Sequence, residues 1–250
     1  IIDNREEIDS KLIKEIEKNN IKVYKGYTIV DTSGYKRINK VSIMQLSKDG
    51  QKAIGSKISI SCDCLGISGG WTPAVHLFTQ SGGKLKFRDE DQVFIPNIYP
   101  SDQISIGSCN GDFTLDEILT TVPKTLKEFL NLKKTGYEDL EIKSSFNKSK
   151  RNIWLLPSDK IIGKTKPFVD YQNDATAKDI KLALREGFRS IEHVKRYTTT
   201  GMGTDQGKLG NMHALGIISE TAGSKMGELG TTTFRPPYTP LTFGTIVGRN

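Results

Sequence analysis

The sequence predicts an α/β fold followed by a small helical module, and three observations predict it. Residues 21–30, 38–47 and 57–60 alternate apolar and polar side chains, which is the pattern of half-buried strands. Residues 104–130 run from a short apolar segment through a glycine loop into a helix, the order in which dinucleotide-binding sheets present backbone amides to a ligand. Residues 176–222 contain three helical segments, two of which begin at capping residues.

The composition indicates a folded protein with a buried core. The chain has 250 residues, of which 36% are hydrophobic, and its formal net charge is +7. Lysines are dispersed among acidic residues, without the clustered arginines and interleaved aromatic residues of a nucleic-acid groove. The apolar runs are far shorter than the roughly 20 residues of a membrane-spanning helix, and no signal peptide is evident. We therefore expect no nucleic-acid partner, no membrane partner and a cytoplasmic location.

The N-terminal part of the chain predicts one helix and a meander of strands. Residues 9–20 place apolar side chains on one helical face and charged side chains on the other. The apolar positions of that face are Leu12, Ile13 and Ile16. Residues 49–50 form a turn between two of the strands, because Asp-Gly favours hairpin turns. The apolar run at residues 62–67 then predicts a further, buried strand.

The three cysteines, Cys62, Cys64 and Cys109, suit a reducing compartment better than a disulfide framework. Cys62 and Cys64 resemble half of a metal site, but no second Cys or His pair stands at a ligand-like spacing. In the strand expected at residues 62–67, both thiols face the same core. We therefore interpret all three cysteines as small buried side chains.

A first glycine segment follows this strand. Ser68, Gly69 and Gly70 permit positive φ angles or the close approach of a ligand, and Pro73 is expected in the first turn of a helix over residues 74–80. A ligand at the N-terminus of that helix would meet unpaired N–H groups and a favourable dipole. A plain strand-to-helix turn explains the same residues, and the spacing alone favours it.

A second glycine segment lies at residues 104–114. A short strand at residues 104–106 enters the loop, and Thr114 with Glu117 forms a capping box for the following helix. Pro123 is expected to end or kink that helix, although apolar spacing resumes beyond it. The dinucleotide-binding signal is incomplete, because the chain contains no opening GxGxxG motif.

The C-terminal part predicts a crossover, a helical module and an extended tail. Residues 143–166 have the polar flanks and prolines of a connection between domains. Helices are predicted at residues 177–186, 190–197 and 211–222. Their capping and stop residues are Thr176 with Asp179, Gly187 and Ser190. Residues 233–240 must run extended, because proline excludes helix there.

No set of catalytic residues assembles in the sequence. The histidines have no nucleophile or carboxylate at a motif spacing, so each is interpreted as a helix-surface or packing residue. They are His76, His193 and His213. Asp170, Asp174 and Asp205 suggest a metal site, but two of them stand beside a helix start, where the dipole already explains an acid. We predict no catalytic and no metal-binding residue on this chain.

Four stretches closely resemble, in order, the alpha subunit of heterotetrameric sarcosine oxidases. They are residues 68–87, 105–119, 168–217 and 232–249. In that family the alpha subunit has a reductase-like fold with two dinucleotide-binding domains and a C-terminal aminomethyltransferase-like domain. The resemblance implies that this chain is a middle fragment of a longer protein.

The resemblance also implies a domain division. Residues 1–142 would be the later part of an NAD-binding domain, residues 143–166 a linker, and residues 167–230 a small helical module of the [2Fe-2S] type. Residues 231–250 would be an extended linker towards a further domain.

The same resemblance assigns NAD contacts to the two glycine segments. In reductase-like folds the loop near the end of the domain approaches the middle of the cofactor. The corresponding residues here are Gly107, Asn110, Gly111 and Asp112. Ser68, Gly69 and Gly70 would lie at a second approach. Because the phosphate-binding fingerprint is expected upstream, we expect the fragment alone to bind NAD poorly and to be inactive.

The helical module resembles the bacterioferritin-associated-ferredoxin type, in which four cysteines hold a [2Fe-2S] cluster. The corresponding residues here are Asp170, Gln172, Asp205 and Gly210. Since such clusters require thiolates, the resemblance implies that no iron–sulfur cluster is present. The glycine loop at residues 199–208 is then a persisting old cluster loop or an interface. Arg196 and Lys208 are candidates for contact with a flavin phosphate or a partner at that interface.

The function implied is the NAD-binding and scaffolding portion of an oxidoreductase complex. That complex would demethylate sarcosine to glycine, transfer one carbon to tetrahydrofolate or release formaldehyde, and form hydrogen peroxide. FAD and FMN are expected on or at the beta subunit, and the gamma and delta subunits complete the heterotetramer. A non-catalytic module that docks a partner remains an alternative, as does an electron-transfer subunit of a related amine or opine dehydrogenase.

Overall fold

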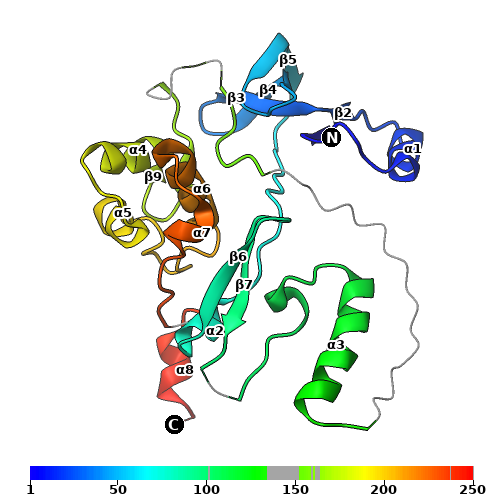
Figure 1. Ribbon diagram of the computed structural model, residues 1–250. Coiled ribbons are helices and arrows are strands. Elements are labelled where there is room, and N and C mark those ends of the chain that lie inside the picture. The colour runs from blue at the N-terminus through cyan, green and yellow to red at the C-terminus, as the bar shows by residue number, and fades with distance from the viewer. Residues whose placement is uncertain (101, 134–151, 159, 161–163, 237, 250) are drawn as a thin grey trace. The chain divides into compact units, whose positions relative to one another are not determined.

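The computed structural model describes residues 1–100, 102–133, 152–158, 160, 164–236 and 238–249. The chain divides into two compact units, residues 1–70 with 147–166 and residues 71–146 with 167–250. Figure 1 labels the helices and strands of both units. Helices and strands are mixed in both units, which agrees with the predicted α/β class. The crossover predicted at residues 143–166 falls largely outside the described residues, and the domain division given above stays a prediction.

An antiparallel three-stranded sheet forms the first unit. Its order is β3 (Tyr27–Gly34), β4 (Ile38–Leu46) and β5 (Ala53–Ser61), as the alternating pattern predicted. In the centre, Ile43 pairs with Ile29 of β3 and Ile58 of β5 and is fully buried. The core of this unit therefore lies on the middle strand.

The strand expected over residues 21–30 is interrupted. In the first part of this range only Tyr24 and Lys25 are in a strand, β2 (Tyr24–Lys25). Strand β2 pairs in parallel with β1 (Ile2–Asp3). Gly26 then adopts a φ of +68° and separates β2 from β3. This left-handed conformation favours glycine, and it ends the alternation that the sequence suggested.

Helix α1 (Ser10–Lys18) confirms the predicted N-terminal helix. The Asp9 carboxylate accepts a hydrogen bond of 2.8 Å from the Lys11 N–H and caps the first turn. Ile13 is buried, whereas half of Leu12 is exposed. Of the three predicted apolar positions, only Ile13 is fully buried, so the helix buries a narrower face than the sequence predicted.

The prediction of a buried strand at residues 62–67 is wrong. Strand β5 ends at Ser61, and the following residues form no strand. Cys64 is exposed and Ile67 is 75% exposed, so the two nearby thiols do not share a core. The physical reason is pairing: β5 is an edge strand, and within the described chain no neighbouring strand offers hydrogen bonds to an extended run here.

The second unit begins with a short helix and a hairpin. Helix α2 (His76–Gln80) starts later than predicted, because Val75 N–H bonds to Pro73 O in a preceding turn. Strands β6 (Lys84–Arg88) and β7 (Val93–Ile98) pair antiparallel and bury one stretch of β7. The buried side chains there are Val93, Phe94 and Ile95.

A 3-10 turn and a long helix follow the hairpin. The turn η1 (Gly107–Asn110) leads to α3 (Leu115–Phe129), whose capping box is formed by Thr114 and Glu117 as predicted. The short strand expected at residues 104–106 does not form, although Ile106 is extended. Pro123 does not end α3, because the helix runs from Leu115 to Phe129 with Pro123 inside it.

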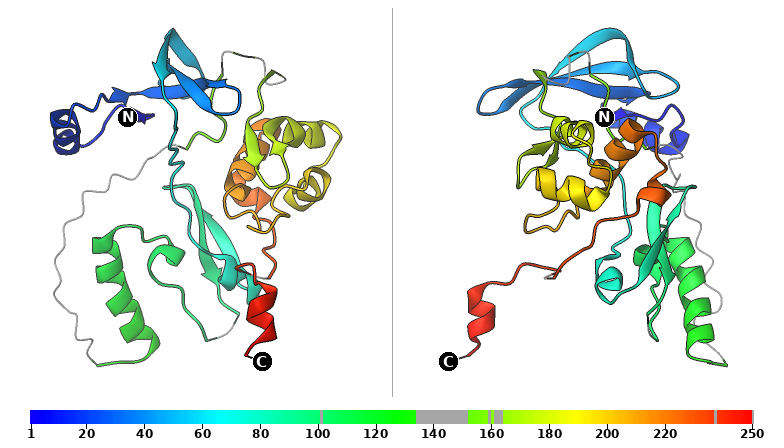
Figure 2. Two further views of the ribbon diagram at one scale, coloured as in Figure 1. Left: turned by 180° about the vertical axis from the view of Figure 1, so that it is seen from behind. Right: turned by 60° about the vertical axis from the view of Figure 1, so that its left-hand side comes forward.

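The helical module has the three predicted helices. They are α4 (Ala177–Arg185), α5 (Ile191–Thr198) and α6 (Asn211–Ala222), and they form one group in each view of Figure 2. Leu215, Ile217 and Ile218 of α6 are buried, and α6 packs against α4. A hairpin of β8 (Phe168–Asp170) and β9 (Ala175–Thr176) precedes α4, and the sequence did not predict it.

The end of the chain also differs in detail from the prediction. Residues 231–236 and 238–242 contain no helix or strand, as the prolines predicted. Two short helices, α7 (Met226–Leu229) and α8 (Phe243–Val247), were not predicted. Gly227 of α7 lies against β6, where an added Cβ would be 3.3 Å from the Phe87 Cβ.

Candidate functional site

The carboxylate of Asp170 joins the β8–β9 hairpin to the glycine loop. Asp170 is 6% exposed and accepts hydrogen bonds from the N–H groups of Gly201 at 2.7 Å and Gln172 at 2.8 Å. Asn173 donates from its backbone at 3.0 Å and from its side chain at 3.3 Å. Burial acts to raise the pKa of Asp170, but these hydrogen bonds outweigh it and hold the pKa below its ordinary value. The side chain is therefore an ionised cross-link between two loops.

The side chain of Gln172 forms a second cross-link. Its Oε1 accepts from the Asp205 N–H at 3.1 Å, and its Nε2 donates to Thr204 Oγ1 at 2.7 Å. Asp205 Oδ1 in turn accepts from the Gly207 N–H at 3.1 Å. At Gly210 an added Cβ would lie 2.3 Å from the Val169 carbonyl oxygen, so only glycine fits. The structure thus brings the four predicted cluster-ligand positions into one place, and three of their side chains make hydrogen bonds there.

A cavity of about 410 Å³ opens beside these cross-links. Its lining combines apolar walls with two carboxylates and one ammonium group. The lining residues are Val169, Asp170, Tyr171, Gln172, Asp205, Lys208 and Leu209. Tyr171 and Leu209 are 65% and 64% exposed, so the cavity opens to the surface. Within the described residues, no group of three or more His, Cys, Asp or Glu side chains could hold a metal ion.

Packing against Asn211 explains two of the loop glycines. Gly201 and Gly207 have φ angles of +73° and +72°, and an added Cβ on either would lie within 2.3 Å of Asn211 Oδ1. The Asn211 Nδ2 donates to Thr232 Oγ1 at 2.9 Å and to the Gln206 carbonyl at 3.4 Å. Close packing against Asn211 and the positive φ angles therefore account for glycine at these two positions without a ligand.

The two cationic candidates already have partners. Arg196 Nη1 donates to the Glu192 carbonyl at 3.0 Å and lies 3.2 Å from Glu192 Oε2. The Lys208 ammonium donates to the Tyr238 carbonyl and lies 3.8 Å from the centroid of the Tyr238 ring. Lys208 also lines the cavity described above, whereas Arg196 does not.

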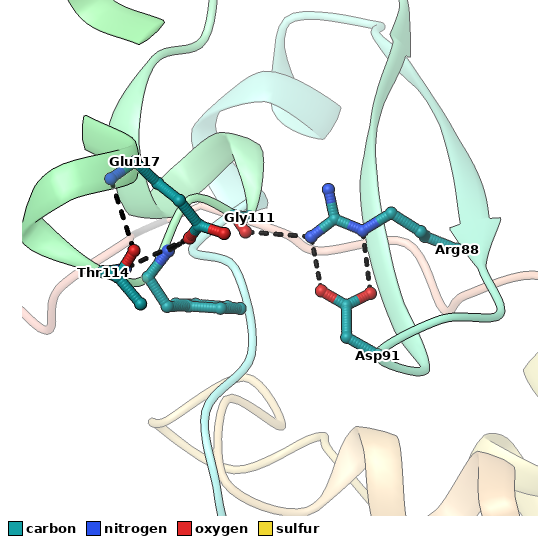
Figure 3. A network of polar contacts seen from close by, with 6 residues as sticks. Arg88, Asp91, Gly111, Thr114 and Glu117 are labelled. Atoms are coloured by element: carbon teal, nitrogen blue, oxygen red, sulfur yellow. Dashed lines mark hydrogen bonds and ion pairs between the residues drawn. The ribbon is translucent and has the colours of Figure 1, made fainter. Parts of the chain in front are cut away.

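The second glycine segment is held by an arginine (Figure 3). Arg88 pairs with Asp91 through both Nε and Nη2, and its Nη2 also donates to the Gly111 carbonyl at 2.9 Å. The hydrogen bond to Asp91 raises the pKa of Arg88. Gly111 has a φ of +86°, which favours glycine, and an added Cβ would also lie 2.6 Å from Arg88 Nη2 and 3.0 Å from Ile95 Cγ2. Arg88 and Asp91 were not predicted from the sequence. Their opposite charges three residues apart are the signal that could have indicated an ion pair.

The helix cap holds the other side of the same loop. In Figure 3, Glu117 N–H donates to Thr114 Oγ1 at 3.3 Å, and Glu117 Oε2 accepts from Thr114 N–H at 3.3 Å. Asp112 Oδ2 accepts from Thr121 Oγ1 at 3.1 Å. Gly107, in contrast, has a φ of +67° and open space where a side chain would start. Gly107 is nevertheless a buried residue, so the space beside its Cα is not by itself an opening at the surface.

Comparison with known proteins identifies the family. Residues 164–249 match the model of the sarcosine oxidase A3 domain. The chain is 32% identical over 241 residues to the sarcosine oxidase alpha subunit of Corynebacterium sp. (strain P-1), covering 92% of this chain and 24% of that protein. With the alpha subunit of Rhizobium meliloti (strain 1021) it shares 36% identity over 232 residues, 88% of this chain and 23% of the relative. The chain belongs to the sarcosine oxidase alpha subunit family.

The chain spans about a quarter of the length of those relatives. It shares its fold with L-proline dehydrogenase from P. horikoshii, at a TM-score of 0.57 and 19% identity, over 99% of this chain and 50% of that one. An opine oxidase subunit of Rhizobium meliloti (strain 1021) is 33% identical over 73 residues, which is 29% of this chain and 16% of the relative. No helix in the described part of the chain is long and apolar enough to cross a bilayer.

The predicted site residues of this chain fall into separate groups. Gly107, Asn110, Gly111 and Asp112 lie together around η1 in the second unit. Ser68, Gly69 and Gly70 are exposed and end the first unit, and Gly70 has a φ of +109° with open space beside it. Lys208 and Arg196 lie in the helical module.

Proposed function

We propose that this chain is the NAD-binding and scaffolding portion of the alpha subunit of a sarcosine-oxidase-like complex. The observation that carries the proposal is identity of 30% to 36% with three sarcosine oxidase alpha subunits over most of the chain. The A3-domain match over residues 164–249 supports it. Because the chain spans about a quarter of those relatives, the activity and partners of the complex belong to the proposal.

The complex would convert sarcosine, oxygen and water to glycine, formaldehyde and hydrogen peroxide, or pass the one-carbon unit to tetrahydrofolate. A bound flavin would supply the acceptor for the hydride that leaves the substrate. FAD and FMN would be bound on or at a beta subunit. Gamma and delta subunits would complete a cytoplasmic heterotetramer. This chain would contribute no catalytic side chain.

The NAD contacts are assigned to the two glycine segments. Gly107 supports this assignment through its left-handed backbone and the free space beside its Cα, although the residue itself is buried. Asn110, Gly111 and Asp112 belong to the same proposed contact, with Gly111 and Asp112 positioned by Arg88 and Thr121. A second proposed approach uses the exposed Ser68, Gly69 and Gly70.

The helical module would serve without an iron–sulfur cluster. Asp170 and Gln172 support this proposal, because hydrogen bonds join the two loops at positions where cluster thiolates would otherwise join them. Arg196 and Lys208 remain the proposed contacts to a flavin phosphate or partner surface. Lys208 is the better placed, because it lines the cavity of about 410 Å³.

The test is to express the full-length gene with its neighbouring subunits and purify the complex. We expect released NAD and flavin, and peroxide formed in step with oxygen uptake on sarcosine. Gly107→Val should lower the NAD content, because it fills the open side of a residue with φ of +67°. A nucleotide-free chain without a flavoprotein partner would overturn the proposal in favour of a docking module.

A second candidate is an electron-transfer subunit of an amine or opine dehydrogenase. The match to an opine oxidase subunit over 73 residues favours it. Iron analysis of the same purified complex separates the two candidates. Iron and acid-labile sulfide in stoichiometric amounts would favour electron transfer, and iron-free protein with sarcosine-dependent peroxide would favour the first candidate.

A further inference from the structure

His76 is a buried histidine whose ring nitrogens have no partner. The side chain is 7% exposed, and its ring lies 4.1 Å from the Phe234 ring and 5.7 Å from the Tyr238 ring. Neither Nδ1 nor Nε2 has a hydrogen-bond partner within the described residues. Buried polar groups in folded proteins are nearly always hydrogen-bonded, so this imidazole requires an explanation beyond packing.

A cavity of about 30 Å³ lies against His76. Most of its wall is apolar, and its lining comes from α2 and the residues before it, β7, α5, the glycine loop, α6 and the segment after α7. The residues that the argument uses are His76, Phe94, Lys208, Asn211, Thr232 and Phe234. A single water needs about 10–15 Å³ of such space, so the cavity has room for a group of only a few atoms.

The charge around this cavity is positive. Among the described residues that line it, Lys208 carries the charge, and the other titratable group is His76. Strand β7 contributes Phe94, α5 contributes Ile191, and the segment after α7 contributes Thr231, Thr232 and Phe234. Burial, and then the charge of Lys208, lower the pKa of His76 below 6.5. The buried imidazole therefore faces a small space whose described lining includes Lys208 and no carboxylate.

We propose that this cavity binds a carboxylate group or a similarly small monoanion, next to the imidazole of His76 and the ammonium of Lys208. The anion would accept a hydrogen bond from His76 and interact with Lys208, giving the buried ring the partner it lacks. Its negative charge would also favour the protonated imidazole, so anion binding and proton uptake by His76 would be coupled. Lys208 keeps its contact with Tyr238 in this arrangement.

The test measures the titration of His76 by NMR in the full-length protein carrying ¹³C-labelled histidine, with His76→Gln to assign the resonance. Without a small anion, the pKa of His76 should lie below 6.5. Formate should raise that pKa in a saturable way, whereas benzoate should not, because its ring exceeds a cavity of about 30 Å³. These readouts do not depend on sarcosine oxidation, so they are separate from the test of the proposed function.

A matched pair of variants locates the binding site. Lys208→Met should abolish the formate effect, and Lys178→Met, on the exposed side of α4, should leave it unchanged. If the pKa of His76 does not change when formate is added, the proposal is overturned. Equal shifts with formate and benzoate would also overturn it, since they would report a general salt effect. The comparison of formate with benzoate on the wild-type protein tests the proposal even if the Lys208→Met variant does not fold.

Discussion

Helices α6 and α3 differ in what surrounds them. Both were predicted from the sequence, and both lie in the second unit. Five residues of α6 are buried, from Ala214 to Ile218, whereas α3 contains no buried residue although it is longer. α6 packs against α4, while α3 contacts η1. Capping and spacing therefore decide where a helix forms, and segments distant in sequence decide what it buries.

The largest expected effect is from a cavity in α6. Ile218 is fully buried, so Ile218→Ala should lower the free energy of unfolding by about 2–5 kcal/mol. Leu115→Ala in α3 is the matched control, because Leu115 is 56% exposed and its loss should cost less than about 0.5 kcal/mol. Urea unfolding followed by circular dichroism measures both.

The Ile218→Ala and Leu115→Ala variants can contradict the difference in burial between α6 and α3. A loss at Leu115 as large as that at Ile218 would mean that α3 is covered by something in solution. A small loss at Ile218 would mean that α6 tolerates a cavity, and that burial against α4 contributes little.

The sequence predicted the locally determined elements and missed those that depend on distant partners. Thr114 with Glu117 and Thr176 with Asp179 were found because a cap needs only residues three apart. Residues 62–67 were assigned a strand in error, because a strand forms only where a second strand can pair with it. The two helices after residue 225 are only four and five residues long, too short for an apolar periodicity to predict them.

The site was predictable in part for the same reason. The resemblance placed Asp170, Gln172 and Asp205 together, but it gave no indication that their side chains hydrogen-bond across the loops. His76 was interpreted as a helix-surface or packing residue, and its burial against the tilted ring of Phe234 agrees with packing. Its unpaired nitrogens could not be predicted, because Phe234 and Lys208 reach it only in the folded chain.

The next largest effect is expected at the loop cross-link. Asp170→Asn should cost about 2 kcal/mol, because several buried donors lose a charged acceptor. Asp112→Asn, near α3, is the matched change and should cost less than about 1 kcal/mol, since its described hydrogen bond comes from a single hydroxyl donor. Thermal and urea unfolding at neutral pH compare the two variants.

The pH dependence adds an independent check on Asp170. Its folded-state pKa is below 3.8, so its stabilisation is complete above that value and is lost as the pH falls through the folded pKa. The stability difference between wild type and Asp170→Asn should therefore shrink as the pH falls below about 4. A difference that stays constant down to pH 2 would show that shape, and not the carboxylate charge, joins the two loops.

The smallest loss of stability is expected from removing a helix cap. These variants test whether a cap stabilises only its own helix. Glu117 caps α3 and Asp179 accepts from both the N–H and the hydroxyl of Thr176 at the start of α4, at 2.8 and 2.7 Å. Glu117→Ala and Asp179→Ala should each cost about 1 kcal/mol, although one helix is exposed and the other packs on the core. Hydrogen exchange at the first turn of each helix measures the local loss. A much larger loss at α4 would mean that its cap is coupled to the packing of α6, and that local and long-range contributions are not separable in this module.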